Sequence, residues 1–149
     1  MQRSFDSFLR RWHKMLGLSL QSPPSWYRDR LREELRERRT ATTFIERLSE
    51  TSDVYFCVVR ARYDGFPQRK LPPCPPMVYA YMLAKYSLRW GFYRTTAILC
   101  RAPHYASLSE VVNPAKDSKL DEVSARNQIE SEKFRIMGRR LRKVWPLLP

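Results

Sequence analysis

The sequence predicts an all-α fold: a compact helical domain of about five to seven helices with a proline-rich internal linker. Three observations predict this class. Apolar residues recur at helical spacing in several segments between residues 3 and 145. Thr43-x-x-Glu46 has the pattern of a capping box, which starts helices. Apolar residues make up 43% of the 149 residues and aromatic residues 13%, which is enough for a folded core and more than disordered chains contain.

The chain is strongly basic. It has 28 Lys and Arg residues against 15 Asp and Glu residues, a formal net charge of +13. Such an excess favours polyanionic partners, namely nucleic acid, anionic lipid or an acidic protein. It carries no information about the fold or about a reaction.

Residues 1–24 are predicted to form a flexible or cleavable amphipathic segment, separate from one helical domain over 25–149. Phe5, Phe8, Leu9 and Trp12 share one side of a helix whose other side is basic. This pattern fits a mitochondrial presequence or a membrane-surface anchor, and it equally fits a first helix docked on the core by its aromatic stripe. Gly17 and two prolines end the helix before residue 25.

The segment "SWYRDRLREELRERR" (25–39) contains six arginines and four acids. Arg30, Glu34 and Arg38 follow one another at four-residue spacing, which allows pairs worth about 0.2–0.5 kcal/mol each. We therefore expect a helix whose basic and acidic side chains mostly form ion pairs with one another, and not a surface that binds a polyanion.

Residues 43–76 contain two further elements and a linker. The capping box predicts a short helix through Leu48. Residues 52–65 have strand propensity in Val54–Val59, yet Ser52 or Asp53 offers an N-cap and Phe56, Val59 and Tyr63 share a helical face, so helix is favoured. Five prolines make residues 67–76 an extended linker between two helical layers.

Residues 77–100 form the longest apolar run. Lys85, Arg89 and Arg94 interrupt it, and each is costly inside a bilayer, so we expect a buried protein helix and no transmembrane span. Gly91 marks the point at which this helix could break or kink. Its aromatic residues could stack on bases, although a core role is the more common one.

Residues 119–145 resemble the helix-turn-helix family. The resemblance rests on the spacing of the residues expected to face inward and on the small Ser124 where two helices cross; the inward residues are Leu120, Val123, Ile129, Phe134 and Met137. The turn departs from the family because Asn127-Gln128 stands where Gly is usual. Of these two residues, only Asn adopts the left-handed conformation readily.

The last nineteen residues carry six basic residues against one acid. In a helix from about Glu132, we expect Phe134, Met137, Leu141, Val144 and Trp145 to face inward and the basic residues to face solvent. The family resemblance implies that early residues of the second helix read base edges and that others hold phosphates. The candidate residues for binding nucleic acid or an acidic partner are Arg135, Arg139, Arg140, Arg142 and Lys143.

No pattern in the sequence predicts catalysis. The three cysteines are widely spaced, and neither His13 nor His104 has metal-ligand spacing to other residues, so we expect no catalytic residue, no metal and no cofactor. Cys100 and His104 could be drawn as a nucleophile and base, but no orienting carboxylate lies nearby in sequence.

"SWYRDRLREELRERR", "LSETSDVYF" and "RARYDGFPQRKLP" resemble a family of small uncharacterised proteins of filamentous fungi. The resemblance covers most of residues 25–149 and implies an intracellular setting, in the nucleus or cytoplasm, or in the mitochondrion if residues 1–20 are an import signal. The sequence thus predicts a non-catalytic basic binding protein that contacts nucleic acid through its C-terminal helix, or an assembly factor that docks an acidic protein. It leaves the oligomeric state open.

Overall fold

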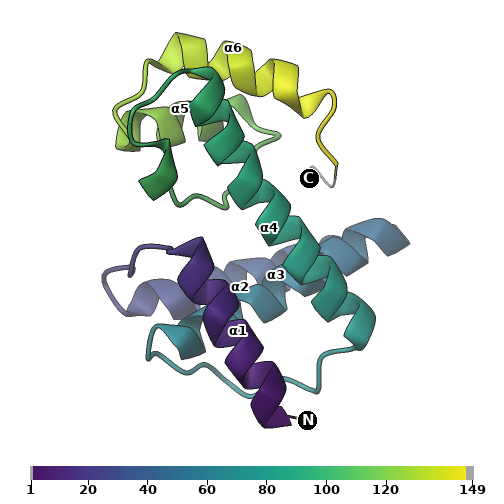
Figure 1. Ribbon diagram of the computed structural model, residues 1–149. Coiled ribbons are helices and arrows are strands. Elements are labelled where there is room, and N and C mark those ends of the chain that lie inside the picture. Colours follow the sequence, from purple (N-terminus) through teal and green to yellow (C-terminus); the bar gives the residue numbers. More distant parts are fainter. Residues whose placement is uncertain (1, 147–149) are drawn as a thin grey trace. The chain divides into compact units, whose positions relative to one another are not determined.

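The computed structural model describes residues 2–146, and this part of the chain is helical without any strand (Figure 1), which confirms the predicted fold class. Six α-helices and one 3₁₀ turn account for the regular structure of these described residues. Their bounds are α1 Gln2–Leu16, α2 Ser25–Thr40, α3 Phe44–Tyr63, α4 Pro76–Leu99, the turn η1 Tyr105–Ser107, α5 Asp117–Arg126 and α6 Ser131–Arg142.

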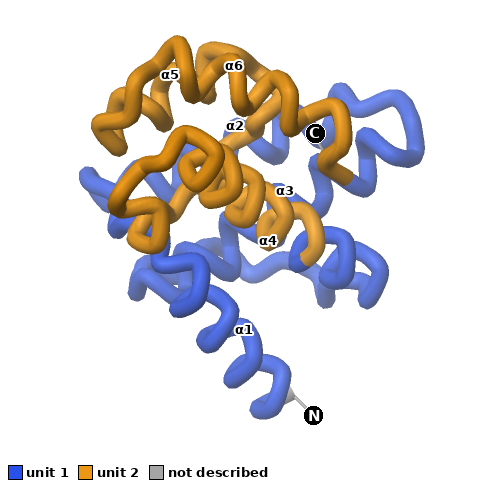
Figure 2. The backbone as a smooth tube through the Cα atoms, turned by 45° about the horizontal axis from the view of Figure 1, so that its top comes forward, with its two compact units in different colours: residues 1–83 blue, residues 84–149 orange. Residues whose placement is uncertain are grey.

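The chain divides into two compact units, residues 1–83 and residues 84–149 (Figure 2). The sequence suggested a different division, with a separate segment 1–24 and one domain over 25–149. The boundary lies inside α4, so the first turns of this helix belong to unit 1 and the remaining turns to unit 2.

In unit 1, α1 packs against α3. Leu9, Trp12 and Leu16 are buried, and the Trp12 ring meets the Phe56 ring edge-on with centroids 6.0 Å apart. Burying three large apolar side chains on one stripe is what holds an amphipathic helix to a core. The structure therefore matches the interpretation of residues 3–16 as a docked first helix. Their possible role as an import signal stays a prediction.

α2 and α3 form the rest of the unit 1 core. Leu31 of α2 packs among Val54, Cys57 and Val58 of α3. Tyr27 is almost fully buried and its hydroxyl donates a hydrogen bond of 2.6 Å to the Asp64 carboxylate at the end of α3. The predicted apolar stripe of residues 25–39 thus faces the core.

The predicted capping box starts α3. The Glu46 N–H donates to the Thr43 hydroxyl at 3.1 Å, and the Glu46 carboxylate accepts from the Thr43 N–H at 3.0 Å. The helix then continues to Tyr63, so the short helix and the element over 52–65 are one helix of 20 residues. The suggestion that Ser52 or Asp53 caps a helix is wrong, because both are buried in the middle of α3.

The predicted linker is free of regular structure up to Pro75, and Pro76 is the first residue of α4. Proline suits this first position because its missing N–H would have no helical partner there. The Tyr55 hydroxyl donates to the Pro72 carbonyl at 2.8 Å and so ties the linker to α3.

α4 continues through Gly91, so the suggested break at this residue is wrong. Gly91 instead makes room for an aromatic ring of unit 2: a Cβ there would lie 3.4 Å from Trp145. The Trp145 indole N–H donates to the Leu88 carbonyl at 2.9 Å. None of the described helices is long and apolar enough to cross a membrane.

Candidate anion-binding site

α5 and α6 form a packed pair in unit 2, at the place where two helices were predicted. Leu120 and Val123 of α5 and Phe134 of α6 are fully buried, as expected from their spacing. Ser124 is also fully buried, and its hydroxyl lies 2.9 Å from that of Ser131. Val144 was expected to face inward, but its side chain is 77% exposed. The helix ends at Arg142, so the helical spacing that predicted an inward position does not extend to this residue.

In the turn between these helices Gln128 takes the left-handed conformation, although Asn adopts it more readily than Gln does. Gln128 has a φ of +55°, whereas Asn127 has −101°. The Ile129 N–H donates to the Ser124 carbonyl at 2.9 Å, the bond that closes a Schellman-type helix end. Asn127 contributes differently, since its side-chain amide donates to the Val123 carbonyl at 2.9 Å.

Three of the five candidate binding residues on α6 hold carboxylates of α5. Arg135 makes two hydrogen bonds to the Asp121 carboxylate, at 2.9 and 2.7 Å. Arg139 and Arg142 both donate to Asp117, and these bonds lower the pKa of Asp117 to about 2. A phosphate would have to compete with these carboxylates, so the three guanidinium groups are poor candidates for a phosphate site.

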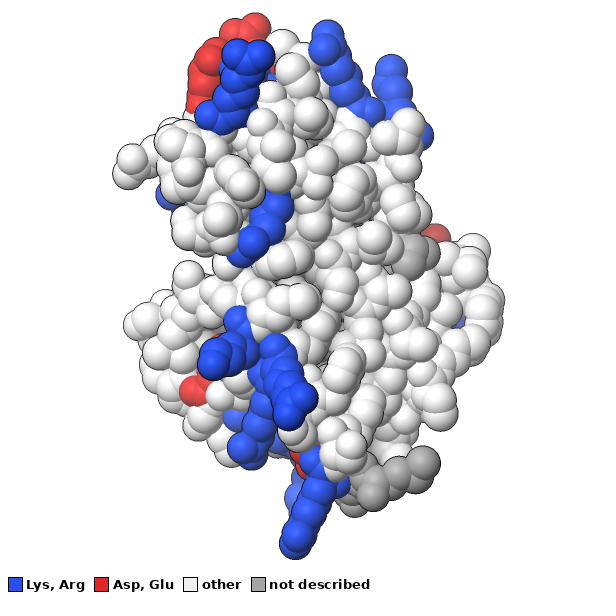
Figure 3. All heavy atoms as spheres, in the orientation of Figure 1, with Lys and Arg blue, Asp and Glu red and all other residues white. Residues whose placement is uncertain are grey.

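Arg140 of α6 and Lys143, which directly follows this helix, remain as exposed cations, and within residues 2–146 no ion pair involves either one. The concentration of charge predicted for this helix is therefore reduced to two of its five candidate residues. Figure 3 shows Asp and Glu side chains beside Lys and Arg side chains at the α5–α6 end of unit 2.

A second group of cations lies on unit 1, and sequence reasoning did not select it as a site. We call it the α1 cationic face, and it is seen among the basic side chains along α1 in Figure 3. All of its members are exposed, and no described acid pairs with any of them: Arg3, Arg10, Arg11 and Lys14 of α1, and Arg62 of α3. Arg62 could not be assigned to it from the sequence, because only the packing of α1 on α3 brings it there.

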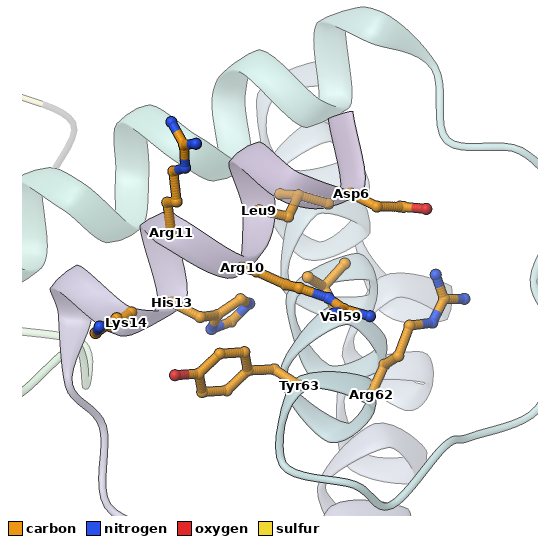
Figure 4. Close-up of a pocket in the computed structure, with 9 residues that line it drawn as sticks. All are labelled: Asp6, Leu9, Arg10, Arg11, His13, Lys14, Val59, Arg62 and Tyr63. Carbon is orange, nitrogen blue, oxygen red and sulfur yellow. The ribbon is translucent and has the colours of Figure 1, made fainter. Parts of the chain in front are cut away.

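A hollow of about 550 Å³ opens between α1 and α3 within this face (Figure 4). Leu9 and Val59 give it an apolar floor, and Asp6 is the one acid among the described residues that line it. Arg10 and Arg62 reach toward one another across it, while Arg11 points away. Two like charges directed at the same space create a positive potential that favours an anion between them.

His13 lines the same hollow and is 3% exposed. Its ring stacks on the Tyr63 ring with centroids 5.0 Å apart and planes at 20°. Burial, together with the nearby Arg60, lowers the pKa of His13 to about 4, so the ring is neutral at pH 7. Its buried Nε2 has no hydrogen-bond partner in the described part of the chain, and buried polar atoms rarely remain so.

One cluster of carboxylates in unit 1 has the spacing of metal ligands. Glu34 of α2 and Glu50 and Asp53 of α3 place one oxygen each within 4.8 Å of the others. The Arg30 guanidinium is ion-paired to the Glu34 carboxylate, so positive charge is already present in the cluster. We interpret the group as an ionic network of the α2–α3 contact.

Glu34 makes the stability of unit 1 depend on pH. Burial raises the pKa of Glu34 to about 7; Asp53 and Glu37 add to this increase, whereas Arg30 opposes it. An ordinary Glu in the unfolded chain ionises near pH 4.5, so folding holds the proton more tightly. The resulting stabilisation is complete below about pH 4.5 and is lost as the pH rises through about 7.

We therefore expect the free energy of unfolding of the native protein to fall by about 1–3 kcal/mol between about pH 5 and pH 8 relative to that of Glu34→Gln. Urea unfolding at both pH values measures this difference. Glu33→Gln is the matched control, because Glu33 also pairs with Arg30 and is 53% exposed. Parallel pH profiles for the native protein and Glu34→Gln would show that Glu34 is ionised in the folded state throughout this range.

His104 and Cys100, considered above as a nucleophile and base, have other roles in unit 2. The His104 Nε2 lies 2.7 Å from the Asn127 carbonyl oxygen and so ties η1 to the α5–α6 turn. Burial raises the pKa of the Cys100 thiol, which lowers its reactivity as a nucleophile.

The arrangement of the described residues thus offers chemistry for holding an anion more than for transforming one. The α1 cationic face and its hollow combine guanidinium groups, an ammonium group and a neutral imidazole. Comparison of the chain with protein families, with curated proteins and with solved structures finds no match.

Proposed function

We propose that this protein is a non-catalytic binding protein whose partner is nucleic acid, and that it contacts this partner through the α1 cationic face and not mainly through α6. The observation that supports the proposal most is the difference between the two surfaces. Arg135, Arg139 and Arg142 have carboxylate partners, whereas the five cations of the α1 cationic face have none among residues 2–146. Only cations that are free of acids can replace the counterions of a phosphate backbone without a competing loss.

The test is the salt dependence of oligonucleotide binding, measured by fluorescence anisotropy. Five phosphate contacts to a single strand predict that the affinity falls by about 100-fold between about 50 and 200 mM salt. Removing three contacts in Arg10→Gln/Arg11→Gln/Lys14→Gln reduces this fall to about tenfold.

The matched control changes the same number of charges on α6. Lys133→Gln/Arg140→Gln/Lys143→Gln is expected to keep a salt dependence close to that of the native protein. Absence of binding even at low salt would remove the proposal. A reduced salt dependence in the α6 variant alone would return the contact surface to the C-terminal helix.

A second candidate function is the docking of an acidic protein. It is favoured by Phe8 and Met15 of α1, which are 48% and 47% exposed and lie on either side of Arg11 along one helix face. A cationic face with apolar groups suits an acidic amphipathic segment. The rest of the apolar stripe of α1 is not accessible to a partner, because Leu9, Trp12 and Leu16 are buried. One stoichiometric protein partner after nuclease treatment would favour this candidate over nucleic acid.

A further inference from the structure

We propose that the hollow between α1 and α3 is a binding site for a nucleoside phosphate, with the phosphate between Arg10 and Arg62 and with the base against Tyr63. This inference rests on the proposed function and deepens it, because it names the ligand class of one site within the α1 cationic face. The same chemistry can come from a free mononucleotide or from the phosphorylated end of a strand.

Two cations of the hollow are placed to share one anion. Arg10 extends from α1 and Arg62 from α3, and their guanidinium groups are directed toward one another, while Lys14 lies at the other end of the hollow (Figure 4). Guanidinium groups bind phosphate oxygens with two parallel hydrogen bonds. A phosphate monoester carries close to two negative charges at neutral pH, which matches two facing guanidinium groups better than a single carboxylate does.

His13 provides an independent reason to expect a polar ligand. It is more than nine-tenths buried, it lines the hollow, and its Nε2 has no hydrogen-bond partner in the described chain. A neutral imidazole can donate or accept one hydrogen bond there, depending on its tautomer. The Nε2 itself is closed to solvent in this structure. A phosphate oxygen or a ribose hydroxyl in the hollow would satisfy this atom once the imidazole turns toward the ligand.

The rest of the lining fits the organic part of the ligand. Tyr63 is 44% exposed and stacks on His13 with one face, so the ring is held in place while a large part of it stays accessible. Bases stack on such aromatic rings irrespective of sequence. Asp6 at the edge can accept a hydrogen bond from an amino or hydroxyl group. The volume of about 550 Å³ lies within the usual range for small-molecule sites.

The experiment titrates the intact protein with adenosine 5′-monophosphate, uridine 5′-monophosphate, adenosine and inorganic phosphate, and follows the ¹⁵N resonances of the His13 ring. We expect both mononucleotides to shift these resonances with dissociation constants below about 1 mM. Adenosine and inorganic phosphate, which each lack one half of the ligand, are expected to bind at least tenfold more weakly. Absence of any His13 shift with the mononucleotides would overturn the inference.

Substitutions separate this inference from the proposed function. Arg62→Gln is expected to weaken mononucleotide binding at least tenfold, and Arg62→Lys to restore part of it. Arg3→Gln is the matched control, because Arg3 belongs to the α1 cationic face but does not line the hollow: it should weaken binding of long oligonucleotides and leave mononucleotide binding unchanged. An equal loss of mononucleotide binding in Arg3→Gln and Arg62→Gln would indicate a diffuse charge effect and overturn the site.

The source of the phosphate is decided by comparing 5′-phosphorylated and 5′-hydroxyl oligonucleotides of the same sequence. If the phosphorylated strand binds more tightly, and Arg62→Gln abolishes this difference, the ligand is a strand end. If the two strands bind equally and mononucleotide binding is retained, the ligand is a free nucleotide. Salt-dependent oligonucleotide binding without any mononucleotide binding would overturn this inference and leave the proposed function intact. Mononucleotide binding without oligonucleotide binding would overturn the proposed function and leave the mononucleotide site intact.

Discussion

Trp12→Ala is expected to lower the free energy of unfolding by about 3–5 kcal/mol. Trp12 is 6% exposed, and its ring lies edge-on to the rings of His13 and Phe56, at centroid distances of 5.0 and 6.0 Å. Its removal leaves a cavity beneath α1 that neighbouring side chains fill only in part. A loss of this size is a large fraction of the 5–15 kcal/mol that stabilises a typical domain.

The same substitution also tests how the site is held. Because α1 carries Arg10 and Lys14, a loosened α1 separates them from Arg62, and we expect anion binding to weaken together with stability. Urea unfolding followed by circular dichroism measures the first effect, and oligonucleotide anisotropy measures the second.

Phe8→Ala is the matched control for Trp12→Ala. Phe8 lies on the same helix and is 48% exposed, so its loss is expected to change stability by no more than about 1 kcal/mol. Equal stability changes in the two variants would contradict the docking of α1 on α3 described here.

Phe134→Ala is expected to have an effect of similar size on unit 2, about 3–5 kcal/mol. Phe134 is fully buried, and its ring lies parallel to that of Tyr93, with an interplanar angle of 7° and centroids 6.4 Å apart. It packs in the same cluster as Leu120 and Val123 of α5, so it joins α6 to both α4 and α5.

The control for Phe134→Ala is Ile136→Ala, two residues further along α6, where the side chain is 40% exposed. Its cost is expected to be about 1 kcal/mol or less. Thermal unfolding of the two variants gives the comparison. A Phe134→Ala variant as stable as Ile136→Ala would show that the α4–α5–α6 core is packed differently.

Sequence periodicity was sufficient to predict the buried faces of α5 and α6. Leu120, Val123 and Phe134 occupy the interior because their spacing places them on one side of each helix. The residue preference alone did not identify the left-handed position: the Asn127 side chain donates to the Val123 carbonyl, and the next residue, Gln128, takes the left-handed conformation that completes the helix end. The preference of Asn for the left-handed conformation is outweighed here by the hydrogen bond of its side chain, which forms only when the turn folds.

Sequence periodicity was less informative for α3. Ser52 and Asp53 have the propensities of a helix start, yet they lie inside a long helix. The helix begins at the capping box of Thr43. It continues past Ser52 and Asp53 because apolar residues such as Val54 and Val58 pack against Leu31 and stabilise it there. Packing of this kind routinely overrides weak local preferences.

Charge counted along the chain did not show which cations have acidic partners in space. The C-terminal segment is rich in cations, but Asp117 and Asp121, which pair with three of them, belong to the preceding helix. The cations around the hollow on unit 1, in contrast, are not paired with acids of a neighbouring helix. They come from α1 and α3, and no acid of α2 or α3 forms an ion pair with them.

The proposed contact depends on the five cations of the α1 cationic face, which have no acidic partner among residues 2–146. The most direct test is to record ¹H–¹⁵N correlation spectra of the intact protein while a short single-stranded oligonucleotide is added at low salt. We predict that the largest amide shifts fall in residues 3–14 and 59–63. Shifts confined to residues 131–143 would contradict it and assign the contact to the C-terminal helix.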